Sequence, residues 1–148
     1  MKERIIDFLI FIFWLTTVIV YPMLVSIYVT MPLFIGFAGL MLILGIDEGR
    51  IWQIILSILY MINLEINLSL PLFLIPTSVA IYMLFFKNKL SLLKLCPICI
   101  KIATVIFINI IYFLLLYAYD FVQSQNSVNY DSFLLFTFIY DIIAAVLI

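Results

Sequence analysis

Two cysteines stand close together in this chain, in the segment Cys96-Pro97-Ile98-Cys99. Thiols at this spacing can form a dithiol that is oxidised and reduced, or can supply half of a metal site. The 148 residues include no other cysteine and no histidine. Most zinc sites and all histidine-based catalytic triads are therefore excluded. The residues predict neither a cofactor nor a metal, and no enzyme site that we favour.

One acid lies inside an apolar stretch. Asp141 falls near the middle of segment 132–148, where ionising an acid costs several kcal/mol. Tyr140, Asn109 and Tyr112 are the polar side chains that can bond it. A hydrogen bond between helices is favoured over ion transport, because a proton or cation path would use more than one acid.

A second acid, Glu65, stands at the end of an apolar segment, in a polar stretch with Asn63, Asn67 and Ser69. These four positions alternate along the chain and do not make one face of a helix. We therefore expect a bent or extended connector here, with a carboxylate that reaches water. Because acids at membrane depth mark function or a partner, we keep Glu65, Asp141 and Asn109 as candidate intramembrane polar or partner-contact residues.

Segment 87–101 mixes four lysines with leucines. Such a segment can lie along the anionic inner leaflet of a membrane, where each lysine adds about 1 kcal/mol of attraction. Contact with a cytoplasmic protein is the alternative. The candidate residues of this cytoplasmic surface are Lys87, Lys89, Lys94 and Lys101.

The elements that position these residues follow from the composition, which is 68% hydrophobic and 10% charged. That is too little polar surface for a protein that meets water on all sides, and the net charge of −1 argues against nucleic acid. A spanning helix needs about 20 apolar residues. We predict an all-α fold, a single transmembrane domain over 1–148. Its six spans are expected over 5–28, 30–46, 51–65, 71–86, 102–119 and 132–148, with a polar loop over 120–131.

The basic residues set the number of spans and their orientation. A single helix over 51–86 would be about 54 Å long, against a hydrocarbon core of about 30 Å. Two spans there leave no lysine or arginine in any outside loop, as the positive-inside rule requires. Both termini are then cytoplasmic, in a multi-pass protein of the bacterial inner membrane. The residues on the cytoplasmic side are Lys2, Arg4, Arg50, Lys87, Lys89, Lys94 and Lys101.

The cysteine segment also resembles the first cysteine pair of the DsbB-type quinone oxidoreductases, which would make the chain a membrane thiol oxidoreductase. That family has a second cysteine pair and an arginine after the first, whereas the nearest cation here is Lys101. The expected orientation also places Cys96 and Cys99 on the reducing side of the membrane, where stable disulfides are rare. We favour a pair of small apolar residues at the start of a helix.

From Pro32 onward the order of segments resembles the rod shape-determining protein MreD family. That family has a charged turn between two spans, an acid before a Pro-Leu pair, a basic cluster after the next helix, and a tyrosine with a polar neighbour in the last helix. The corresponding residues here are Asp47-Glu48-Gly49-Arg50, Glu65, Pro71-Leu72, Lys87-Asn88-Lys89 and Tyr140-Asp141.

This resemblance implies a non-enzymatic inner-membrane scaffold of the peptidoglycan elongation machinery. It implies membrane lipid as surroundings and other membrane subunits as partners: an MreC-like protein, RodA and a penicillin-binding transpeptidase. The implied bundle is similar to the S-components of energy-coupling-factor transporters, so a small-molecule-binding S-component is an alternative. Those proteins carry AxxxA contacts in their first helix, and 5–28 contains no alanine, which ranks the scaffold first.

Overall fold

The computed structural model describes residues 2–28, 31–92, 96–123 and 130–147. The described residues contain α-helices and no β-strand, so the prediction of an all-α fold is confirmed for this part of the chain. The helices are α1 (Lys2–Ile27), α2 (Ile35–Glu48), α3 (Ile51–Asn67), α4 (Leu74–Phe85), α5 (Lys87–Leu92), α6 (Pro97–Gln123) and α7 (Tyr130–Leu147).

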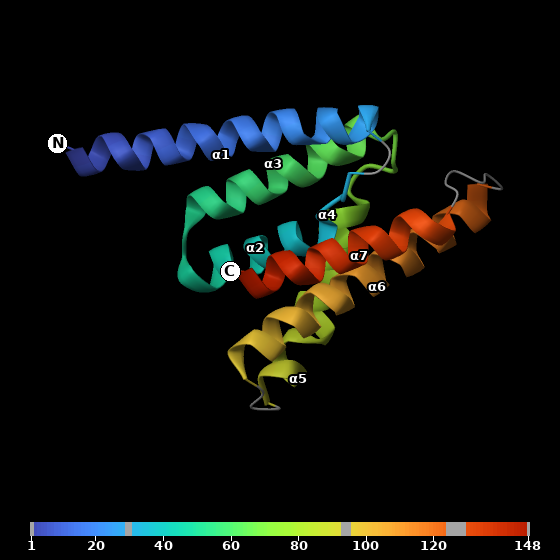
Figure 1. Cartoon of the computed structure of the whole chain (residues 1–148). Helices are drawn as coiled ribbons and strands as arrows, with labels where there is room; N and C mark the ends of the chain where they lie inside the picture. The colour runs from blue at the N-terminus through green and yellow to red at the C-terminus, as the bar shows by residue number, and fades with distance from the viewer. Residues whose placement is uncertain (1, 29–30, 93–95, 124–129, 148) are drawn as a thin grey trace.

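Most of the helices run broadly along one direction, and α4 crosses them steeply (Figure 1). Helix α2 is central, since it packs against α3, α4, α6 and α7, whereas α3 is the only described helix whose backbone runs close to α1. Helices α6 and α7 lie side by side. Apolar side chains of α2, α3, α4 and α6 form the core, which includes Ala38, Leu64, Val79 and Ile108. Helix α1 is therefore attached along one edge of the bundle.

Two helices begin later than the sequence pattern predicts. We expected the second span from residue 30, but α2 begins at Ile35, and we expected the fourth from residue 71, but α4 begins at Leu74. In each case a phenylalanine in the left-handed conformation precedes the helix: Phe34 has φ 49° and Phe73 has φ 67°. A residue in this conformation cannot continue a right-handed helix, which explains both late starts.

Helix α6 is longer than the expected span 102–119. It begins at Pro97, a residue suited to the first helical position because its missing N–H would have no partner there. It continues through Gln123, so residues 120–123 belong to a helix and not to the expected polar loop. The remainder of that loop, 124–129, lies outside the described residues.

The expected connector at Glu65 is also wrong, because α3 continues through Asn67. Asn63 and Glu65 do not need one common face, since they bond different parts of the chain. Asn63 donates its side-chain amide to the carbonyls of Val18 and Ile19 in α1, at 3.2 and 3.1 Å, while Glu65 bonds the chain at the start of α4.

Helix α6 is both long and apolar enough to cross a membrane, and it is the one such helix among the described residues. Of its most apolar 18-residue window, 33% is buried within the chain, which is low for the core helix of a water-soluble protein. Shorter apolar helices accompany it. These are Phe11–Ile27 within α1, α3, α4 and Phe136–Leu147 within α7.

Candidate functional site

The side chain of Asp141 is completely buried between three helices. Its Oδ2 accepts a hydrogen bond from the backbone N–H of Gly36, in the first turn of α2, at 2.9 Å. The same oxygen accepts one from Nδ2 of Asn109 in α6, also at 2.9 Å. Asp141 of α7 thus acts as a cap for α2 supplied by another helix. Two of the candidate residues therefore meet, whereas Tyr140 is exposed on α7.

Glu65 is also completely buried, so the expectation that its carboxylate reaches water is wrong. Its two oxygens accept hydrogen bonds from the backbone N–H groups of Phe73 and Ile75, both at 2.6 Å. These groups lie where α4 begins, and they have no partner within that helix. The carboxylate is buried because it accepts the hydrogen bonds of these N–H groups, which water would otherwise accept.

The same three-residue sequence precedes both capped helices. Pro32-Leu33-Phe34 precedes α2 and Pro71-Leu72-Phe73 precedes α4. In both, the phenylalanine is the left-handed residue before the helix and makes no side-chain cap. In both, a buried carboxylate bonds the N–H two residues later, at Gly36 or Ile75. The repeated Pro-Leu-Phe sequence is the feature from which the caps of α2 and α4 could have been predicted.

Close packing at Gly36 fixes the position of the Asp141 cap. A Cβ atom placed on Gly36 would lie 2.5 Å from Nδ2 of Asn109 and 2.8 Å from Cγ1 of Val105. No side chain fits there without displacing Asn109, the second donor to Asp141. Glycine therefore allows α2, α6 and α7 to meet at one point.

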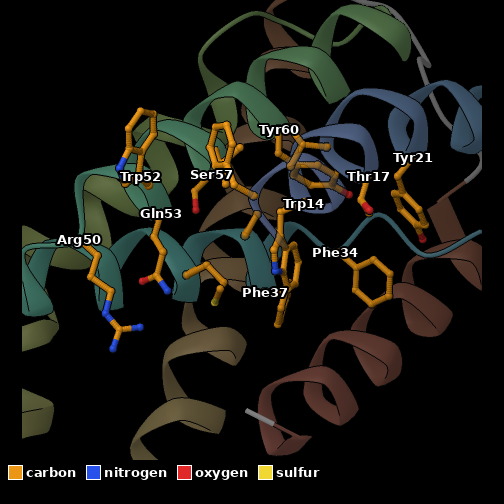
Figure 2. A pocket seen from close by; sticks show the side chains of 15 residues that line it. Trp14, Thr17, Tyr21, Phe34, Phe37, Arg50, Trp52, Gln53, Ser57 and Tyr60 are labelled. Carbon is orange, nitrogen blue, oxygen red and sulfur yellow. The ribbon is translucent and has the colours of Figure 1, made fainter. Parts of the chain in front are cut away.

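A cavity of about 1000 Å³ lies between α1, α2 and α3, and neither Asp141 nor Glu65 lines it. Figure 2 shows Arg50, Trp52 and Gln53 at one end of it, and Tyr21 with Phe34 at the other. Seven of its fifteen lining residues are aromatic, and both tryptophans of the chain are among them. Its lining residues are Phe11, Trp14, Thr17, Val18, Tyr21, Phe34, Phe37, Ala38, Met41, Arg50, Trp52, Gln53, Leu56, Ser57 and Tyr60. We call it the aromatic groove.

The end of the aromatic groove at Tyr21 is closed by contacts between aromatic rings. The ring of Tyr21 lies 5.5 Å from that of Phe34 and 6.3 Å from that of Tyr60, measured between ring centres. The hydroxyls of the two tyrosines donate to the carbonyls of Pro32 and Leu33, at 2.7 and 2.8 Å. These bonds hold the non-helical segment before α2 against α1 and α3.

The opposite end of the groove is polar. Nε of Arg50 pairs with a carboxylate oxygen of Glu48 at 2.8 Å, and the arginine side chain is 61% exposed. The side-chain oxygen of Gln53 is buried and has no hydrogen-bond partner in the described part of the chain. This end therefore offers a cation and an unused hydrogen-bond acceptor beside an apolar channel.

The sulfur atoms of Cys96 and Cys99 are bonded to each other, so the two residues are not simply a pair of small apolar residues at a helix start. The disulfide lies at the exposed start of α6. The backbone N–H of Cys99 also lies 3.3 Å from the sulfur of Cys96. In the described residues, no group of three or more cysteine or acidic side chains could hold a metal ion.

The basic candidate residues lie near the start of α5 and α6. Lys87 forms an ion pair with Asp47, which joins α5 to the end of α2. Lys89 is exposed on α5, and Lys101 is partly buried in the first turns of α6. Lys94 lies outside the described residues.

Comparison with known proteins identifies no relative of this chain. No family model matches it, and neither the curated proteins nor the solved structures include one with significant similarity. Its function must therefore be argued from its own residues.

Proposed function

We propose that the chain is a non-enzymatic scaffold subunit of the bacterial inner membrane, similar to MreD, in the peptidoglycan elongation machinery. One observation carries the proposal: the acids on which the MreD resemblance rests, Glu65 before Pro71-Leu72 and Asp141 in the last helix, both cap helices inside the bundle. Neither acid lines the aromatic groove. Their role is to hold α2 and α4 in place, as a scaffold requires.

The capped starts of these two short helices support insertion in a membrane. Helix α2 has 14 residues and α4 has 12, so they are about 21 and 18 Å long, shorter than a hydrocarbon core of about 30 Å. Non-helical backbone at membrane depth is tolerated only where protein groups satisfy it. The carboxylates of Asp141 and Glu65 supply such groups at the point where each short helix begins.

The arrangement of charged segments supports six spans with cytoplasmic termini. Figure 1 has the N-terminal end of α1, the turn between α2 and α3, α5 and the start of α6 at the same end of the bundle. The ion pair between Asp47 and Lys87 joins two of these segments directly. A single basic end is what the positive-inside rule requires of a six-span protein.

The scaffold function predicts a stable complex with a protein of the MreC class, a membrane-anchored periplasmic coiled coil. Affinity purification of the full chain from its own host membranes should retain such a protein, and depletion of the chain should turn rod-shaped cells into spheres. A purification that retains no coiled-coil protein, together with unchanged cell shape, contradicts the proposal. An unrelated six-span protein with the same tag is the control.

The disulfide favours a second candidate, a thiol oxidoreductase. An external dithiol would attack one sulfur of Cys96–Cys99, release the other as a thiolate, and then close its own disulfide, leaving two reduced cysteines in this chain. The chain has no further cysteine to receive the electrons, so a membrane quinone would have to reoxidise the pair. Quinone reduction that depends on Cys96 and Cys99, measured with purified protein and a dithiol substrate, would favour this candidate over the scaffold.

A further inference from the structure

We propose that the aromatic groove binds one acyl chain of an anionic phospholipid from the cytoplasmic leaflet, with the lipid phosphate beside Arg50. The inference rests on the proposed insertion in the membrane. It adds a specific lipid site to the scaffold, which neither the candidate acids nor the cysteines supply.

The length of the groove corresponds to one leaflet. Its wall on α3 extends from Arg50, just before the helix, to Tyr60, which is ten residues or about 15 Å along a helix axis. Half of a hydrocarbon core of about 30 Å is also about 15 Å. A chain that enters beside Arg50 therefore reaches the contacts around Tyr21 and Tyr60 near the middle of the bilayer.

The closed end distinguishes an acyl chain from a helix of a partner protein. At this end the ring of Tyr21 packs against the rings of Phe34 and Tyr60, and the tyrosine hydroxyls hold the segment before α2 across it. A partner helix that spans the membrane would have to continue past this point. A lipid chain ends within its own leaflet and needs no exit.

The open end carries the features that recognise an anionic headgroup. Arg50 has five N–H donors, and its ion pair with Glu48 is made through Nε, so the two terminal nitrogens can bind a phosphate as a bidentate pair. Arg50 also immediately precedes α3, whose N-terminus attracts negative charge. Phosphatidylglycerol, an anionic phospholipid, is therefore the natural probe.

The tryptophans make the groove directly measurable. Both of them, Trp14 and Trp52, line it, so tryptophan fluorescence is sensitive to a lipid bound there. The full chain is placed in phosphatidylcholine bilayers that contain a fixed minor fraction of phosphatidylglycerol, and either lipid carries bromine atoms on its acyl chains as quenchers. We expect brominated phosphatidylglycerol to quench at least twofold more than brominated phosphatidylcholine at equal mole fraction.

Matched variants assign this excess to the groove. Arg50→Gln should remove the excess, Arg50→Lys should keep part of it, and Ser57→Phe should remove it by filling the groove. Lys87→Gln is the charge control, because Lys87 loses the same charge at the same end of the bundle without lining the groove. Leu84→Phe, at an exposed position on α4, is the size control for Ser57→Phe. Circular dichroism checks that each variant keeps its helices.

The outcomes separate this inference from the proposed function. Equal quenching by the two lipids overturns the lipid site while leaving membrane insertion intact. A phosphatidylglycerol excess that Lys87→Gln reduces as much as Arg50→Gln also overturns it, since the attraction would then belong to the surface as a whole. Absence of quenching by either lipid overturns membrane insertion, and with it the scaffold in a membrane. A second copy of the chain in the groove would give crosslinks between position 14 and α1–α3 of another molecule. That result would overturn the lipid site.

Discussion

At the scale of single residues, two buried carboxylates accept hydrogen bonds that water accepts at most helix ends. Asp141 and Glu65 accept hydrogen bonds from N–H groups that no helix can satisfy from within. Neither carboxylate is in the ion pairs of the described residues, which join Arg50 to Glu48 and Lys87 to Asp47. The acids are bound by backbone and amide groups instead.

Replacing Asp141 by alanine should therefore destabilise the bundle strongly. The change leaves the N–H of Gly36 and the amide of Asn109 without their acceptor, and each buried unsatisfied donor costs roughly 1–3 kcal/mol. Asp141→Asn keeps an acceptor oxygen and should lose less. Unfolding of the purified chain in mixed detergent measures the free energy, with Tyr140→Phe on the exposed side of α7 as control. An Asp141→Ala protein as stable as the control contradicts the role of this cap.

The Gly36 contact gives an independent check on the same site. Gly36→Ala places a Cβ against Asn109 and Val105, and overpacking of this kind typically costs about 1–3 kcal/mol. Because Gly36→Ala and Asp141→Ala damage one contact, their combined effect should be smaller than the sum of the two. Glu65→Ala, at the start of α4, should combine additively with either. Full additivity of Gly36→Ala with Asp141→Ala would mean that these residues act separately.

At the scale of elements, a left-handed phenylalanine defines where α2 and α4 begin. Glycine adopts a positive φ without the steric cost that a Cβ brings. Phe73→Gly should therefore leave the stability unchanged or raise it by up to about 1 kcal/mol. Leu72 is the matched control, since it is as exposed as Phe73 (57% and 60%) but does not have a positive φ. Leu72→Gly should lower the stability in the same unfolding assay, and an equal loss in both variants would remove the role of the left-handed residue.

The elements also mark how far the sequence could be interpreted. The helices lie in the apolar segments between the charged turns. A helix bonds its own backbone N–H and C=O groups, which suits segments with so few polar side chains. The start of α2 was misplaced because hydropathy does not register the conformation of Phe34. The connector at Glu65 was wrong for another reason: Asn63 and Glu65 bond different neighbours, α1 and the start of α4. A single-face criterion cannot detect polar residues whose partners come from separate helices.

The candidate site divides in the same way. Asn109 could be named as a partner of Asp141 because few polar side chains occur in the apolar segments, and the two do meet. The backbone partner at Gly36 could not be named, since it depends on how closely α2, α6 and α7 pack. The aromatic groove was also missed. Its residues come from three helices, and in the sequence they resemble ordinary packing and interfacial aromatics.

At the scale of the whole molecule, we propose a six-span bundle whose basic end faces the cytoplasm. The turn between α2 and α3 and the turn between α3 and α4 should then lie on opposite sides of the membrane. Glu48 and Ser69 are exposed residues at these turns. They can be changed one at a time to cysteine in a chain whose own cysteines are removed by Cys96→Ser and Cys99→Ser.

Labelling of these single cysteines with a membrane-impermeant maleimide tests this orientation. We predict that Glu48→Cys reacts in inverted membrane vesicles and is protected in spheroplasts, and that Ser69→Cys reacts in spheroplasts and is protected in inverted vesicles. Reaction of both residues from one side would show that α3 does not cross the membrane. Reaction of each from the side opposite to that predicted would reverse the orientation and place Cys96 and Cys99 outside the cytoplasm.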